Sequence, residues 1–275
     1  TFVSVIGVNN GSIVNINNEL EYTPNPGFLG TETFPYTMRD DNGGEDTGTV
    51  TLNVVPRQLY NVTTQALTGI ADVSSLAAAD LDADGLNDVV TVNRRNDRLT
   101  ILPSQAPDWG QRIEIAVGDT PVDVIGGDLN QDGLDDLAIA NQGDGTVTVL
   151  LNTSPAPGVF TFSVSTITVG GEPQSVKIVD VNQDANLDIV IATSSGNEVV
   201  VAPNTTAAQA AVPTFATLVR VSVPNAADLS VVDINQDNVP DIVSIDPIGN
   251  QVVFALNQGG GAPGQIPIYN APTNL

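Results

Sequence analysis

Four acidic segments of nine residues recur along the chain, and their spacing limits the folds that it can adopt. Successive segments begin 48, 52 and 53 positions apart (80 to 128, 128 to 180, 180 to 233), which is a nearly constant repeat length. A repeat of this size is typical of solenoids, propellers and other arrays of one small structural unit. The segments cover residues 80–88, 128–136, 180–188 and 233–241.

Short apolar runs around each segment predict four strands per repeat. One run begins at the last aspartate of the segment, a second follows a short polar turn, a third comes later, and a lead-in run precedes the next segment. Aliphatic and β-branched residues dominate these runs, and helical periodicity is nowhere sustained. The runs are 88–92, 99–102, 112–117, 121–127, 136–140, 146–151, 160–169, 173–179, 188–192, 198–201, 215–223, 241–245 and 251–256.

Four short strands in about 50 residues correspond to one propeller blade. A solenoid is the competing repeat architecture, but its units usually have a shorter period or contain helices. We therefore predict an all-β chain that consists of four-stranded blades of a partial β-propeller and a small N-terminal β-sandwich-like module.

The spacing of oxygen-bearing side chains in the four segments predicts calcium sites. Carboxylate or amide oxygens fall at positions 1, 3, 5 and 9, and position 7 can offer its backbone carbonyl. Calcium binds six to eight oxygens at about 2.3–2.6 Å, and a nine-residue loop of this kind can wrap around one ion. The predicted ligands are Asp80, Asp82, Asp84, Leu86, Asp88, Asp128, Asn130, Asp132, Leu134, Asp136, Asp180, Asn182, Asp184, Asn186, Asp188, Asp233, Asn235, Asp237, Val239 and Asp241.

Position 6 is where each loop must turn sharply. Gly85 and Gly133 are predicted to have positive φ, which glycine adopts freely. Asn238 tolerates that conformation and Ala185 tolerates it poorly, so the third loop is the least favourable site.

Two alternative interpretations of the loops are less favourable. An EF-hand needs a bidentate glutamate at its twelfth position, but here that position holds Thr91, Ile139, Ile191 or Ser244. Plain Asp/Asn-rich turns would explain one such loop but not four in register. The loops contain 14 of the 32 acidic residues, and so many carboxylates repel one another unless a cation neutralises them. We therefore interpret the metal as structural.

The composition excludes several classes of protein. The chain has no cysteine and no histidine, so it cannot form disulfides, cysteine–zinc sites or a Ser-His-Asp triad. A net charge of −24 argues against binding to nucleic acid or to an anionic membrane surface. No run approaches the ~20 apolar residues that a membrane span needs. Because the calcium loops account for most clustered acids, no pair of catalytic carboxylates remains, and we predict no enzyme activity.

Four segments carry a resemblance to a known family: the loop 128–136, the Leu-Ala-Ile-Ala run 137–140, the run 146–152 and Gly-Gly-Glu-Pro at 170–173. They resemble the bacterial FG-GAP/VCBS-type repeats, which are related to integrin-α propeller repeats, and the resemblance extends over about 58–275. It implies a calcium-stabilised β-propeller, usually of seven blades. Ala185, Asn238 and Pro240 depart from the pattern.

The first 56 residues do not share the repeat. Alternating runs at 19–34, 36–44 and 47–55 predict strands joined by turns, and they resemble the second half of a bacterial cadherin-like or Ig-like module. Two interpretations remain open for the acids Glu32, Asp40, Asp41, Glu45 and Asp46, namely a calcium site and a solvated hairpin loop.

We therefore predict a partial cadherin-like/Ig-like module at 1–56 and propeller blades at 57–275, with four complete repeats and the start of a fifth. Segment 60–69 aligns with the outer strand 162–171 and is expected to belong to the last blade. Segment 268–275 matches the lead-in to another aspartate loop, which suggests that the chain is part of a longer protein. Sequons at Asn10, Asn61, Asn152 and Asn204 suggest exposed loops.

These features favour a non-catalytic, calcium-stabilised structural or adhesion protein at the bacterial surface or outside the cell. Its expected partners are other surface or matrix proteins or glycans, and it can be a subunit of a larger assembly. Neither nucleic-acid binding nor membrane insertion is expected. The alternatives are a propeller that binds a glycan or protein ligand and an accessory domain of a secreted enzyme.

Overall fold

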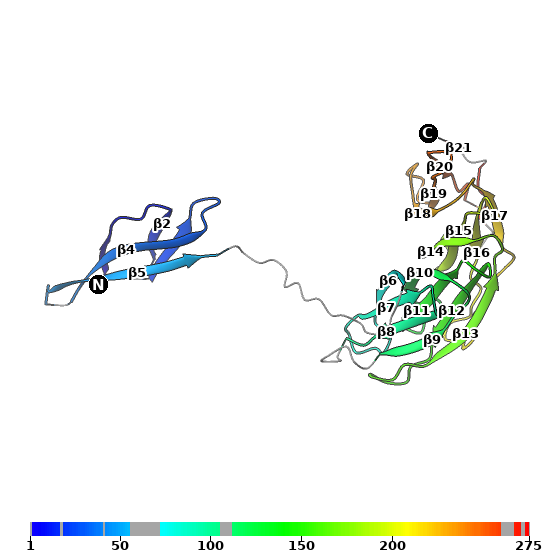
Figure 1. Ribbon diagram of the computed structural model, residues 1–275, viewed down its shortest axis with the longest axis horizontal. Coiled ribbons are helices and arrows are strands. Elements are labelled where there is room, and N and C mark those ends of the chain that lie inside the picture. Colours follow the sequence, from blue (N-terminus) through cyan, green and yellow to red (C-terminus); the bar gives the residue numbers. More distant parts are fainter. Residues whose placement is uncertain are drawn as a thin grey trace. The chain divides into compact units, whose positions relative to one another are not determined.

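The computed structural model describes residues 2–16, 19–40, 42–55, 72–104, 112–259, 267–270 and 273–274. The chain divides into two compact units, Thr1–Thr64 and Gln65–Leu275, shown in Figure 1. The regular secondary structure in these described ranges consists of strands, which confirms the predicted all-β class. They contain no helix long and apolar enough to cross a membrane. The predicted boundary at 56/57 lies outside the described residues and stays a prediction.

The first unit is a small two-sheet module. One sheet has the strand order β1 (Phe2–Val5), β4 (Gly30–Arg39), β5 (Glu45–Val54), and the other is the hairpin of β2 (Gly11–Ile16) and β3 (Glu19–Pro24). Phe34 is buried, and its ring stacks on Tyr22 with the ring centroids 6.3 Å apart. This aromatic pair links the hairpin to the larger sheet.

The candidate acids of the first unit that the structure describes lie toward opposite ends of the β4–β5 ladder. Glu32 is buried and accepts hydrogen bonds from the backbone N–H groups of Asn9 and Asn10 and from the Asn10 side chain. At the other end of the β4–β5 ladder, Asp40 accepts the N–H groups of two turn residues and Glu45 pairs with Arg39. Asp41 lies outside the described residues. The solvated-hairpin interpretation therefore fits Asp40, Glu45 and Asp46, which are exposed, whereas Glu32 is buried.

The described residues of the second unit form four antiparallel sheets of four strands, named here blades 1 to 4 in chain order. Blades 1 and 2 consist of β6 (Val73–Ala79), β7 (Asp88–Asn93), β8 (Arg98–Leu102), β9 (Ile113–Ala116), β10 (Pro121–Gly127), β11 (Asp136–Asn141), β12 (Thr146–Asn152) and β13 (Phe162–Thr168). Blades 3 and 4 consist of β14 (Pro173–Val179), β15 (Asp188–Thr193), β16 (Glu198–Ala202), β17 (Val219–Ser222), β18 (Asp228–Val232), β19 (Asp241–Asp246), β20 (Gln251–Ala255) and β21 (Thr273–Asn274).

Neighbouring blades pack face to face, and an apolar cluster fills each of the three interfaces. The strand β11 shows why the strands of the blades are apolar at successive positions and not only at alternate ones. Its residues Leu137 and Ile139 belong to the cluster shared with blade 1, whereas Ala138 and Ala140 belong to the cluster shared with blade 3. A strand buried on both faces needs apolar residues at every position.

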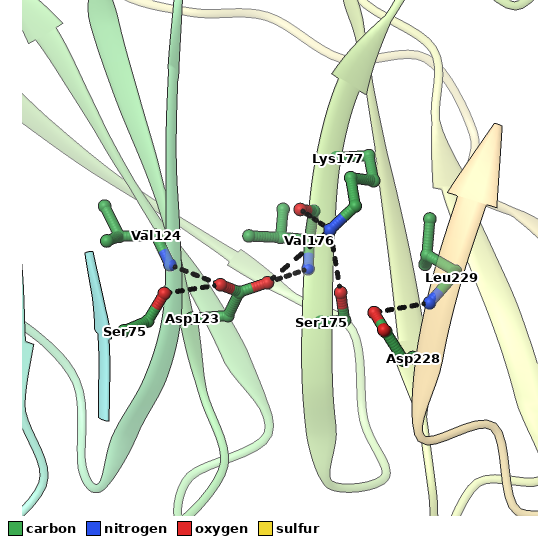
Figure 2. Close-up of polar contacts among 8 residues, drawn as sticks. All are labelled: Ser75, Asp123, Val124, Ser175, Val176, Lys177, Asp228 and Leu229. Atoms are coloured by element: carbon green, nitrogen blue, oxygen red, sulfur yellow. Dashed lines mark hydrogen bonds and ion pairs between the residues drawn. The ribbon is translucent and has the colours of Figure 1, made fainter. Parts of the chain in front are cut away.

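The first strands of the blades lie side by side and are joined by a polar contact at Asp123 (Figure 2). One carboxylate oxygen accepts the Ser75 hydroxyl of blade 1 at 2.8 Å, and the other accepts the Val176 N–H of blade 3 at 2.9 Å. The Lys177 ammonium lies 3.9 Å from the same carboxylate. One side chain of blade 2 therefore holds three consecutive blades in register.

The structure assigns segment 268–275 differently from the sequence. Tyr269 forms a bridge with Asn257, and β21 pairs with β20, so Tyr269 and Thr273–Asn274 pair along the outer edge of blade 4, where the sequence predicted the lead-in to a fifth repeat. The outer edge of β20 presents backbone N–H and C=O groups, and an adjacent extended segment can form hydrogen bonds with them. Segment 60–69 lies outside the described residues, and its assignment to the last blade stays a prediction.

Candidate metal centre

The four aspartate loops connect the first strand of each blade to the second, so all four lie at the same end of their blades. A strand follows each loop, in agreement with the exclusion of an EF-hand. The backbone is left-handed at positions 4 and 6 of every loop. The φ angles are 59° and 86° at Ala83 and Gly85, 56° and 88° at Gln131 and Gly133, 62° and 71° at Gln183 and Ala185, and 63° and 66° at Gln236 and Asn238.

The positive φ at position 6 was predicted from the sequence, whereas the positive φ at position 4 was not. Glycine marks position 6 in the first two loops, whereas position 4 carries ordinary side chains that give no signal of a positive φ. The prediction for Gly85 and Gly133 is confirmed, and Ala185 adopts the same conformation despite its Cβ.

The same hydrogen bonds shape all four loops. In the first loop the Asp80 carboxylate accepts the N–H groups of positions 5 and 6 at 3.2 and 3.0 Å, and the Asp84 carboxylate accepts the N–H of position 7 at 2.7 Å. The equivalent bonds recur with distances of 2.8–3.2 Å in the other three loops. These bonds hold the carboxylates of positions 1 and 5 against the turn of the loop in all four blades.

The first loop has the most complete donor set for a cation. Oxygens of Asp80, Asp82 and Asp84 lie within 4.8 Å of one another. Three carboxylates this close repel one another strongly, and a cation between them removes the repulsion. Carboxylate oxygens are hard ligands that suit calcium or magnesium, so the donor chemistry fits the predicted ion.

The other three loops carry one charge less at this centre. Position 3 is Asn130, Asn182 or Asn235, and its amide oxygen accepts the N–H of position 5 at 3.3, 3.0 and 3.0 Å. The first and fifth positions remain aspartates, namely Asp128 and Asp132, Asp180 and Asp184, and Asp233 and Asp237. An amide oxygen is a weaker ligand than a carboxylate oxygen, but calcium accepts both.

The backbone carbonyl of position 7 is compatible with its predicted role as a calcium ligand. The N–H of each position-7 residue bonds to the carboxylate of position 5. Among the described residues, their carbonyl oxygens accept no hydrogen bond and are open to a cation. The residues are Leu86, Leu134, Asn186 and Val239.

Position 9 makes backbone hydrogen bonds that its spacing did not predict, and its part in metal binding stays a prediction. One carboxylate oxygen accepts the N–H of position 2 at 2.7–3.1 Å, and the other accepts the N–H of the residue sixteen positions later at 2.7–2.8 Å. These buried side chains therefore connect the loop to the end of the third strand, and we call them pegs. They are Asp88, Asp136, Asp188 and Asp241.

Burial also changes the acidity of these pegs. Desolvation raises the pKa of Asp136 to about 7 and that of Asp188 to about 6, although their backbone hydrogen bonds act in the opposite direction. The pKa of Asp88 is raised for the same reason.

A repeated asparagine belongs to the same network and was missed in the sequence. Asn152, Asn204 and Asn257 follow the peg by sixteen residues, and each side chain donates to a carbonyl of its own loop and to position 2 of the preceding loop. Its constant spacing was the available signal. Asn152 and Asn204 are 0% exposed, so the interpretation of these two sequons as exposed loops is wrong.

Two segments of the chain match family models. Residues 1–53 match the bacterial Ig domain, and residues 128–191 match the FG-GAP-like repeat, a range that includes the second and third loops. These matches confirm the resemblance found in the sequence. Both families are non-catalytic modules that are typical of extracellular proteins. No curated protein matches the chain.

Proposed function

We propose that this combination of an Ig-like module with FG-GAP-like repeats is a non-catalytic, extracellular structural or adhesion protein whose blades are stabilised by calcium. The observation that carries the proposal is the convergence of the Asp80, Asp82 and Asp84 carboxylates within 4.8 Å. The shared hydrogen-bond pattern supports weaker equivalent sites in the other three loops, for up to four ions in total.

The surroundings of the loops favour a structural ion. Each loop joins two strands of one blade, and its position-9 aspartate ties it to the third strand. In blades 2 to 4 the repeated asparagine also connects the loop to the preceding blade. A cation in the loop therefore stabilises a junction of several strands. Catalysis by a metal needs an open coordination position and a nearby base, and the chain has no histidine to act as that base.

Calcium should raise the melting temperature of the second unit. A ligand that binds only the folded state adds about 2.7 kcal/mol at a hundredfold excess over its Kd, which corresponds to roughly 5–10 °C for a unit of this size. Differential scanning calorimetry with calcium and with excess chelator measures the effect. Identical transitions in the two conditions would contradict the proposal.

The variant Asp82→Asn tests the first loop. It gives this loop the donor set of the other three, so we expect weaker calcium binding with little change in the calcium-free melt. Isothermal titration calorimetry measures the binding. Asp72→Asn is the matched control, because Asp72 is an exposed residue of the same blade outside the loop, and asparagine accepts its φ of 61°.

The proposed partners are surface or matrix proteins or glycans, and a role as a subunit of a larger assembly fits the same modules. A polar cavity supports ligand binding as a second candidate function. It has a volume of about 740 Å³ and lies at the opposite end of the blades from the aspartate loops, where Gln142, Asp144, Glu172 and Ser195 line it. Glycan-array binding that is lost in Asp144→Ala would favour this candidate, and an array without signal would remove its glycan form.

A further inference from the structure

Glutamine side chains connect neighbouring aspartate loops. Gln131, at position 4 of the second loop, donates from Nε2 to the Ala185 carbonyl at 3.1 Å and to the Asn186 side-chain oxygen at 2.8 Å. Gln183, at position 4 of the third loop, donates from Nε2 to the Asn238 carbonyl at 2.6 Å. Each glutamine thus reaches position 6 of the next loop.

Each of these two glutamines contacts a loop that lacks glycine at position 6. Ala185 and Asn238 receive a bond and hold φ angles of 71° and 66°. A left-handed conformation disfavours alanine by roughly tenfold or more, because its Cβ approaches the following carbonyl oxygen. The second loop has Gly133 at position 6, which adopts positive φ without cost. Position 4 of the first loop is Ala83, which has no side-chain amide to donate.

We propose that Gln131 and Gln183 are positioning residues that hold the next loop in the conformation needed for cation binding. The inference rests on the proposed calcium sites. Each bond fixes the carbonyl of position 6, and with it the peptide that leads to position 7, whose own carbonyl is a predicted ligand. The side chains act across the blade interface, so the second loop positions the third and the third positions the fourth.

Gln131→Ala is the test, with calcium as the probe. Hydrogen exchange of the peptide covering 180–188, followed at increasing calcium concentration, gives the binding midpoint of the third loop alone. We expect this midpoint to rise about three- to tenfold, while the midpoint of the first loop stays unchanged.

Two further variants separate positioning from a general loss of stability. Gln236→Ala is the matched control, since Gln236 occupies position 4 with a φ of 63° and its side chain has no partner among the described residues. Ala185→Gly in the Gln131→Ala background should restore the midpoint, because glycine needs no support at position 6.

The outcomes distinguish the two proposals. If the wild-type protein binds no calcium, the proposed function fails and the positioning role fails with it. If the wild-type protein binds calcium and Gln131→Ala has the same third-loop midpoint, only the positioning role is overturned. A raised midpoint that Ala185→Gly does not restore also overturns it, because the bond would then act on something other than the strained residue.

Discussion

At the scale of single residues, a carboxylate in this chain takes its role from the groups around it. Asp80 and Asp88 belong to the same nonapeptide, and both accept backbone N–H groups with their two oxygens. Asp80 lies beside two other carboxylates in a charged centre, whereas Asp88 is buried and ties the loop to the third strand. Glu32 is a comparable peg in the first unit. The Asn9 N–H bond lowers the pKa of Glu32 most, burial opposes this shift, and Asn10 adds to it.

The first unit should therefore lose stability in acid. Because the pKa of Glu32 is below its usual value of 4.5 when folded, its contribution is complete above that pH and disappears as the pH falls through the lower folded value. Exchange rates of the Asn9 and Asn10 amides measure this opening. In the variant Glu32→Gln we expect the Asn9 and Asn10 amides to exchange faster at neutral pH, and we expect their exchange rates to lose the acid-dependent increase. An unchanged rate would show that the peg does not hold the bend between β1 and β2.

At the scale of elements, burial depends on the presence of a neighbouring blade. Position 2 of the loops shows this clearly. Leu129 of the second loop is 0% exposed in the cluster between blades 2 and 3, whereas Ile234 of the fourth loop is 39% exposed.

These two residues form a matched pair for mutation. Leu129→Ala should cost about 2–5 kcal/mol of unfolding free energy, because it leaves a cavity in a close-packed interface. Ile234→Ala should cost clearly less, since water already reaches its side chain. Urea denaturation of the two variants measures the difference, and equal losses would contradict the packing of the blades described above.

The sequence predicted the strands and loops of the blades well for physical reasons. Strands buried on both faces must be apolar throughout, and Gly85 and Gly133 marked turns that need positive φ. It did not predict the backbone hydrogen bonds of Asp88 and Asn152. The constant spacing of the asparagine marks a repeated feature, but which backbone groups these side chains reach depends on how the blades assemble. The link from Gln131 to Ala185 joins two blades and is hidden for the same reason.

At the scale of the whole molecule, the acidic residues of the proposed calcium loops are concentrated in one of the two units. The four loops hold 14 of the 32 acidic residues and all lie in the second unit. Calcium should therefore stabilise this unit and leave the two-sheet module almost unchanged. The two units should then unfold with different dependences, the first on pH and the second on calcium concentration.

The burial of Asn152 and Asn204 has a practical consequence for producing the protein. Both residues begin acceptor sequences for N-linked oligosaccharides, and in a eukaryotic secretory pathway the modifying enzyme meets the chain before it has folded. A sugar attached there would occupy an amide that must enter the interior and bond to two carbonyls. Modified chains would be unable to close the second and third blades, so a host without this pathway is the suitable one.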